Sequence, residues 1–91
     1  MKFSITIDVS KPMPDDQRNS GWCKKTGKDR WKIWINAEDS LLDRVGSLTH
    51  ELTHFVFWAS FAEGAIKDEV EESVCEAMDK AIVRKIKKVL G

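Results

Sequence analysis

The pentapeptide His50-Glu51-Leu52-Thr53-His54 places two imidazoles and a carboxylate at a spacing suited to metal chemistry. It lies inside an apolar run with helical periodicity, and positions i and i+4 of a helix share one face. Both imidazoles can therefore point at one metal ion, while Glu51 can reach a water molecule bound to that ion. The chain has 2 His residues, and both are in this pentapeptide. We expect His50 and His54 to be metal ligands and Glu51 to be a general base.

A catalytic zinc ion needs a third protein ligand and keeps one coordination position open for water. Both His residues are already used and the chain contains no Tyr, so the expected third ligand is a carboxylate. Acidic residues are concentrated at 68–76, and a turn at Gly64 would bring this stretch back beside the His pair. The candidates within it are Glu71, Glu72 and Glu76. Glu71 falls nearer the centre of the apolar face, and the other two fall toward its edge.

These residues resemble the gluzincins, the thermolysin-like branch of zinc peptidases, which carry His-Glu-x-x-His on one helix and a Glu ligand on the next. In that family an acid four residues after the ligand Glu often hydrogen-bonds the first His, and Glu72 and Glu76 match this spacing. HELTHFVFW, followed by an acidic helix ending in AIVRKIKK, also resembles short His-Glu-x-x-His proteins common in phage genomes. The resemblance covers roughly residues 31–90.

The resemblance implies a minimal gluzincin without a second lobe. Its metal would be Zn²⁺, its third ligand Glu72, and its activity that of a zinc metalloendopeptidase on a peptide or protein substrate. The chain departs from the family because it has no Tyr or third His to stabilise the oxyanion. The zinc ion, a backbone N–H, Arg30, Lys32 or Asn36 would have to serve instead. Loss of one such donor commonly lowers the rate by about 10² to 10³, so a weak or narrowly specific enzyme is expected.

The alternative function is a zinc-stabilised protein-binding module without catalytic activity. In a domain of 91 residues, a bound metal adds directly to folding stability. Glu51 favours catalysis, because a purely structural site has no use for a carboxylate beside its first ligand. A further hypothesis places a Cys23 thiolate on the open position of the zinc, which would make a latent enzyme.

The elements that must position these residues follow from the hydrophobic pattern. Residues 2–9 alternate between apolar and polar as a half-buried strand does, and residues 22–36 read as a hairpin with a Gly-containing turn. A helix is expected from Ser40, with Asp43 completing a capping motif, and a second helix from Asp68. We therefore predict an α+β fold, in which a small antiparallel sheet packs on two consecutive helices.

Each helix has an apolar stripe that is expected to face the core. In the first helix the His pair lies opposite this stripe, beside Phe57, Trp58 and Phe61, which could line an apolar subsite. The stripe of the second helix consists of Val70, Val74, Met78, Ala81, Ile82, Ile86 and Val89. The edge of the strand at 30–36 directly precedes the first helix and is the expected binding edge for an extended substrate.

The bulk properties set the remaining expectations. Residues 1–91 are expected to form a single domain, and the formal net charge of +0 gives no general attraction to nucleic acid or membrane. No apolar run approaches the length of a membrane span. Cys23 and Cys75 have no Cys-x-x-Cys spacing, which fits a reducing cytoplasm. The sequence does not set the oligomeric state.

Overall fold

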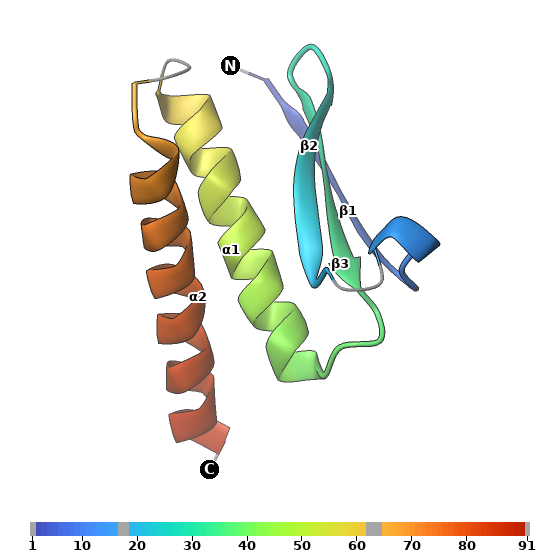
Figure 1. Cartoon of the computed structure of the whole chain (residues 1–91), viewed down its shortest axis with the longest axis vertical. Helices are drawn as coiled ribbons and strands as arrows, with labels where there is room; N and C mark the ends of the chain where they lie inside the picture. Colours follow the sequence, from blue (N-terminus) through green and yellow to red (C-terminus); the bar gives the residue numbers. More distant parts are fainter. Residues whose placement is uncertain (1, 17–18, 62–64, 91) are drawn as a thin grey trace.

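The computed structural model describes residues 2–16, 19–61 and 65–90 (Figure 1). Its elements, in chain order, are β1 (Ser4–Ser10), a 3₁₀ helix (Pro14–Asp16), β2 (Gly21–Gly27), β3 (Arg30–Asn36), α1 (Leu41–Ser60) and α2 (Asp68–Leu90). The strands form a 3-stranded sheet, and the two helices follow it in the chain. The predicted α+β class is therefore confirmed.

The strand order in the sheet is β1-β3-β2, so β3 is the central strand. β2 and β3 form the expected antiparallel hairpin, whereas β1 runs parallel to β3, with Ser4 opposite Arg30 and Ser10 opposite Asn36. The sheet is therefore mixed, and the prediction of a wholly antiparallel sheet is wrong in this one pairing. The alternating pattern of β1 carries no information on strand direction. Its expected burial is also incomplete, since Ile7 and Val9 are each 49% exposed.

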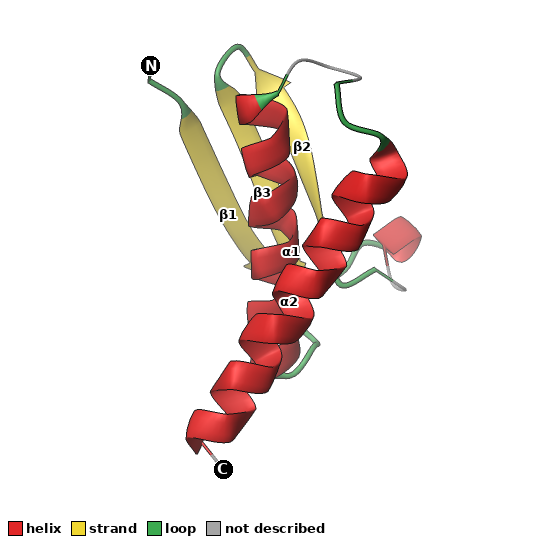
Figure 2. Ribbon diagram, turned by 90° about the vertical axis from the view of Figure 1, so that its left-hand side faces the viewer, coloured by secondary structure: helices red, strands yellow, loops and turns green. Residues whose placement is uncertain are grey.

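The layers are stacked with α1 in the middle, between the sheet and α2 (Figures 1 and 2). α1 packs on β2 and β3, and in the described part of the chain α2 packs on α1 but on no strand. Ile33 and Ile35 of β3 are buried beneath α1 together with Phe55, whose ring contacts Trp31 at a centroid distance of 5.0 Å. α1 is therefore held between α2 and the sheet. The His pair lies on the side of α1 that faces α2, and Glu51 lies on the side that faces the sheet.

Trp22 and Trp34 form a second apolar layer on the face of the sheet that points away from α1. Their rings stack at a centroid distance of 6.0 Å, and Trp34 is buried. The indole N–H of Trp34 donates a hydrogen bond to Ser10 Oγ at 3.0 Å, which ties β1 to the central strand. The same hydrogen bond satisfies the polar end of the buried Trp34 ring.

Much of the apolar stripe of α2 does not face the core, contrary to the sequence-based prediction, although Ile82 and Ile86 are half-buried. The exposed fractions of Val70, Val74, Met78 and Val89 are 50%, 38%, 50% and 75%. The side of α2 that faces α1 carries Glu71, Cys75 and Asp79 instead. The helix is rotated because two of these residues are carboxylates that hydrogen-bond the His pair, and hydrophobic periodicity alone does not reveal such pairing.

The ends and the crossing of the helices follow local rules. Ser40 caps α1, since its Oγ accepts a hydrogen bond from the backbone N–H of Asp43 at 3.2 Å. The predicted turn at Gly64 lies outside the described residues. Gly46 permits the close approach of the helices, because a Cβ there would lie 2.9 Å from a methyl group of Val83. Neither α1 nor α2, as described, is long and apolar enough to cross a membrane.

Candidate metal centre

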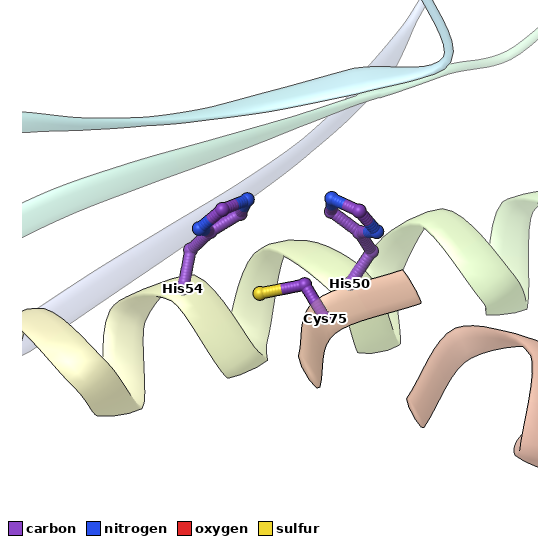
Figure 3. A group of neighbouring side chains, drawn as sticks. All are labelled: His50, His54 and Cys75. Carbon is purple, nitrogen blue, oxygen red and sulfur yellow. The ribbon is translucent and has the colours of Figure 1, made fainter. Parts of the chain in front are cut away.

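His50 and His54 project from successive turns of α1 toward α2, as the spacing predicts. Their rings lie at a centroid distance of 5.0 Å, and Figure 3 shows both on the same side of the helix. Their side chains are 18% and 15% exposed, so each ring is held at the helix interface yet still reaches solvent. The pair is thus displaced from the main core, which lies between α1 and the sheet.

The Glu72 carboxylate lies between the two imidazoles. Its Oε1 is 3.0 Å from His50 Nε2, and its Oε2 is 3.1 Å from His54 Nε2. The Nε2 atoms of both rings therefore converge on one carboxylate from the opposite helix. Two imidazole nitrogens and a carboxylate oxygen form the donor set of a catalytic His₂Glu zinc site, so these residues fit a metal ion of that kind.

The other nitrogen of each ring is held by a second carboxylate. His50 Nδ1 lies 2.6 Å from Asp79 Oδ2, and His54 Nδ1 lies 2.7 Å from Glu71 Oε2. A carboxylate accepts a hydrogen bond, so each Nδ1 carries a proton, and Nε2 is the nitrogen on which a metal ion beside Glu72 would take the place of a proton. Histidine ligands of metal ions are commonly oriented in this way, because the carboxylate fixes both the tautomer and the ring position.

The three candidates for the third metal ligand have different contacts in the structure. Glu72 contacts both Nε2 atoms, and Glu71 contacts the Nδ1 atom of His54. Glu76 is exposed and, among the described residues, contacts neither imidazole. The expectation that Glu76 would hydrogen-bond the first His is therefore wrong, and Asp79 has that position. On a helix, the 72–79 spacing spans two turns along one face, so both carboxylates point toward α1.

Electrostatics in the cluster favour the protonated forms of two groups in the metal-free protein. Burial lowers the pKa of His50, but the hydrogen bond to Asp79 and the charges of Glu72, Glu51 and Asp79 outweigh it, so the net pKa is raised. Burial also raises the pKa of Glu51, against the opposing influence of His54 and His50, and the charge of Glu72 adds to the rise. The carboxylates of Asp79, Glu71 and Glu72 all contact the His pair, and such a group of negative charges suits a divalent cation.

Glu51 lies on the side of α1 that faces the sheet, next to the start of β2. It is 9% exposed, and a Cβ added to Gly21 would lie 3.7 Å from its Cγ. Glu51 therefore packs beside the first residue of β2. Glu51 and His50 both line a cleft of about 670 Å³. The carboxylate is thus buried, yet it borders this cleft.

The cleft is bounded by three elements. Ser20 and Gly21 form its sheet side, and Asp43, Gly46, Ser47, His50 and Glu51 form its floor on α1. Its α2 side consists of Asp79, Lys80, Val83, Arg84 and Lys87. His50 therefore borders an open groove between β2 and α2, and His54 lies one helical turn beyond it on α1.

Cys75 is a member of the cluster that sequence reasoning missed. Its side chain is fully buried, and its sulfur and one nitrogen of each His lie within 4.8 Å of one another (Figure 3). Burial raises the pKa of its thiol to about 12, and the charges of Glu72, Glu71, Glu51 and Asp79 contribute to the rise. Its helical position could have predicted this place, because residues 72 and 75 share a face of α2.

Two of the three side chains expected as oxyanion stabilisers, Lys32 and Asn36, have other partners. Lys32 pairs with Asp8 at 3.6 Å. The side-chain amide of Asn36 donates to the backbone oxygen of Asn19 and accepts from the backbone N–H of Glu38. Arg30 is exposed at the start of β3, on the same face as Lys32. A backbone N–H or the metal ion remains for this role.

β3, whose edge was the expected binding edge for an extended substrate, is the central strand of the sheet. β3 is paired on both sides, so it has no free edge, and β2 is the edge strand beside Glu51. Cys23 lies on β2 and is partly buried. Burial raises the pKa of the Cys23 thiol to about 11, with a contribution from Glu51, and this disfavours the thiolate that a latent enzyme would need.

Comparison of the chain with protein-family models, with curated proteins and with solved structures finds no match.

Proposed function

We propose that the protein is a zinc-dependent metallopeptidase, in which His50, His54 and Glu72 bind Zn²⁺ and Glu51 is the general base. The observation that carries the proposal is the convergence of both Nε2 atoms on Glu72, at 3.0 and 3.1 Å. The two Nδ1 atoms are meanwhile held by acids of α2. A surface helix that merely contained two His residues would have no reason to direct both rings at one carboxylate and fix both tautomers.

The residues have separate tasks in this reaction. A bound zinc ion supplies the Lewis acidity that makes water a nucleophile near neutral pH. Glu51, buried at the cleft, takes the proton as water attacks the scissile carbonyl and delivers it to the leaving amine. Asp79 and Glu71 keep the imidazoles oriented through their Nδ1 atoms.

The free edge of β2 is the proposed binding edge for an extended substrate. The backbone N–H of Asn36 donates to the Ser20 oxygen, so Ser20 belongs to a hydrogen-bonded pair of the β2–β3 ladder. The alternation of antiparallel ladders then directs the N–H and C=O groups of Gly21 and Cys23 away from β3. A peptide can add to this edge as a further strand, with its scissile bond near Glu51.

Trp58 provides an apolar surface beside the proposed metal ion. Its ring stacks on His54 at a centroid distance of 5.7 Å and an interplanar angle of 27°, and 44% of the residue is exposed. Phe61, the C-cap residue of the same helix, is 48% exposed. These rings form the proposed apolar subsite. The free thiols Cys23 and Cys75 agree with the reducing cytoplasm that we propose as the compartment.

Cys75 favours one alternative, a zinc-stabilised binding module without catalysis. If its sulfur joined His50, His54 and Glu72, four protein ligands would surround the ion, and closed sites of this kind are structural. The buried position of Glu51 at the cleft favours the catalytic site, because a closed structural site gives that carboxylate no task.

The experiment that separates the two functions is turnover by Glu51→Gln. Wild type and variant are loaded with zinc, their metal content is measured, and a proteome-derived peptide library is digested and read by mass spectrometry. The proposal predicts equal zinc content and a loss of cleavage of at least about 10²-fold, as expected for a general base. Cleavage at the wild-type rate by Glu51→Gln would reject Glu51 as the base. Zinc binding without cleavage by wild type would favour the binding module.

A further inference from the structure

The cleft beside the His pair becomes basic away from the proposed metal ion. Lys80, Arg84 and Lys87 line its α2 side and are exposed. Asp43, in the first turn of α1, is the acid opposite them. Among the described residues, none of the three cations forms an ion pair. The far end of the cleft therefore has an excess of positive charge in a protein whose formal net charge is +0.

The distance from the reacting centre follows from helix geometry. Asp79 contacts His50, and a helix rises about 1.5 Å per residue, so Arg84 and Lys87 lie about 8 and 12 Å further along α2. An extended peptide spans about 3.3 Å per residue. The cations are thus within reach of a group about two to four residues from the scissile bond.

The direction of the substrate follows from β2. This strand begins at Gly21, at the cleft, and runs away from it to Gly27. A peptide that pairs antiparallel with β2, the more stable pairing, runs toward the cleft. Its residues before the scissile bond then lie along β2, and its residues after the bond enter the basic end.

Resting on the proposed function, we infer that the basic end of the cleft binds a substrate carboxylate on the C-terminal side of the scissile bond. An Asp or Glu side chain and the free C-terminus of a peptide both supply this group. The enzyme therefore prefers acidic residues about two to four positions after the cleaved bond, or cleaves close to a free C-terminus. Arg84 offers two parallel N–H donors to a carboxylate, and Lys87 and Lys80 add charge.

Binding and cleavage together test this inference. Four peptides with an N-terminal fluorescein share one sequence but end in Glu-Glu or Gln-Gln, each with a free or an amidated C-terminus. Their affinities for zinc-loaded Glu51→Gln are measured by fluorescence anisotropy at low and high salt. We expect the amidated Gln-Gln peptide to bind most weakly, by about fivefold or more, and the difference to shrink with salt. A gain restricted to the free termini assigns the site to the C-terminus, and a gain in the amidated Glu-Glu peptide assigns it to side chains.

Matched variants on α2 provide the control. Arg84→Gln/Lys87→Gln should remove the preference for a carboxylate, whereas Lys85→Gln/Lys88→Gln removes the same charge from the same helix outside the cleft and should retain it. Equal or undetectable binding of all four peptides, or the same loss in both double variants, overturns the inference.

Cleavage separates this inference from the proposed function. If wild type cleaves peptides with no acidic preference after the bond, the inference fails and the proposed function stands. If wild type cleaves nothing but the carboxylate preference in binding depends on Arg84 and Lys87, the proposed function fails and the binding site stands.

Discussion

Asp79 Oδ2 lies 2.6 Å from Nδ1 of His50, although the two residues are 29 positions apart in the chain. The contact joins α2 to α1 and directs the other ring nitrogen, Nε2, toward Glu72 at 3.0 Å. Glu71, nearer the start of α2, contacts Nδ1 of His54 in the same way. The two helices are therefore held together at the point where the proposed metal ion binds, so metal affinity and helix packing are coupled.

We predict that Asp79→Asn and Glu71→Gln weaken zinc binding by about 10- to 100-fold each, because an amide orients the imidazole less firmly than a carboxylate. Zinc at saturating concentration should still bind, since the ligands themselves are intact. Competition with a chromophoric zinc chelator measures the change. Glu76→Gln is the matched control, because Glu76 is an exposed acid of the same helix. An unchanged affinity in both variants would show that these carboxylates do not support the site.

Much of the site was predictable because its chemistry is local. The i, i+4 spacing of His50 and His54 places both rings on one helix face, whatever the rest of the chain does. Glu51, adjacent to the first ligand, follows from the same pentapeptide. The β2–β3 hairpin was predictable for a similar reason, because short-range alternation and a turn define it.

The orientation of α2 and the burial of Cys75 could not be predicted, because they depend on contacts between elements distant in the sequence. The rotation of α2 is set by the pairing of Glu71 and Asp79 with the His residues, and its apolar stripe suggested a different face. Hydrophobic periodicity predicts which side of a helix is apolar, but not whether a polar cluster on another side binds more strongly to the neighbouring helix. Cys75 was missed for this reason, since only the rotated α2 buries it beside the rings.

The place of Cys75 in the metal site can be tested with Co²⁺, which reports thiolate ligation by a charge-transfer band in the near ultraviolet. The proposed ligands are His50, His54 and Glu72, so cobalt-loaded wild type should lack this band. Cys75→Ala should bind cobalt with a nearly unchanged visible spectrum. It should lower the free energy of unfolding by about 1 kcal/mol, because a small buried side chain is lost. A strong thiolate band that disappears in Cys75→Ala would make Cys75 a ligand and favour the closed, structural site.

Gly21 should be intolerant of a side chain. A Cβ there would lie 2.7 Å from the backbone oxygen of Trp34, so β2 must move away from β3. We expect Gly21→Ala to lower the free energy of unfolding by about 1–3 kcal/mol in urea denaturation. Cleavage should fall further than stability alone explains, because β2 adjoins Glu51.

Gly27→Ala is the control for this prediction, because Gly27 ends the same strand. A Cβ at Gly27 would meet Arg30 side-chain atoms at 3.7 Å, which is an ordinary contact. Its effect on the free energy of unfolding should stay within about 1 kcal/mol. Equal effects of the two substitutions would refute the close approach at Gly21.

The most direct test of the account is the zinc content of wild type, Glu72→Gln and Glu76→Gln, purified with zinc present and measured by elemental mass spectrometry. Thermal melts with and without a chelator accompany it and show that each variant is folded. The account predicts one zinc ion per wild-type chain, the same for Glu76→Gln, and loss of zinc from Glu72→Gln, because Glu72 contacts both Nε2 atoms. Chelation should lower the melting temperature of wild type and leave that of Glu72→Gln unchanged. A folded wild type without zinc, or full zinc content in Glu72→Gln, would contradict the proposed site.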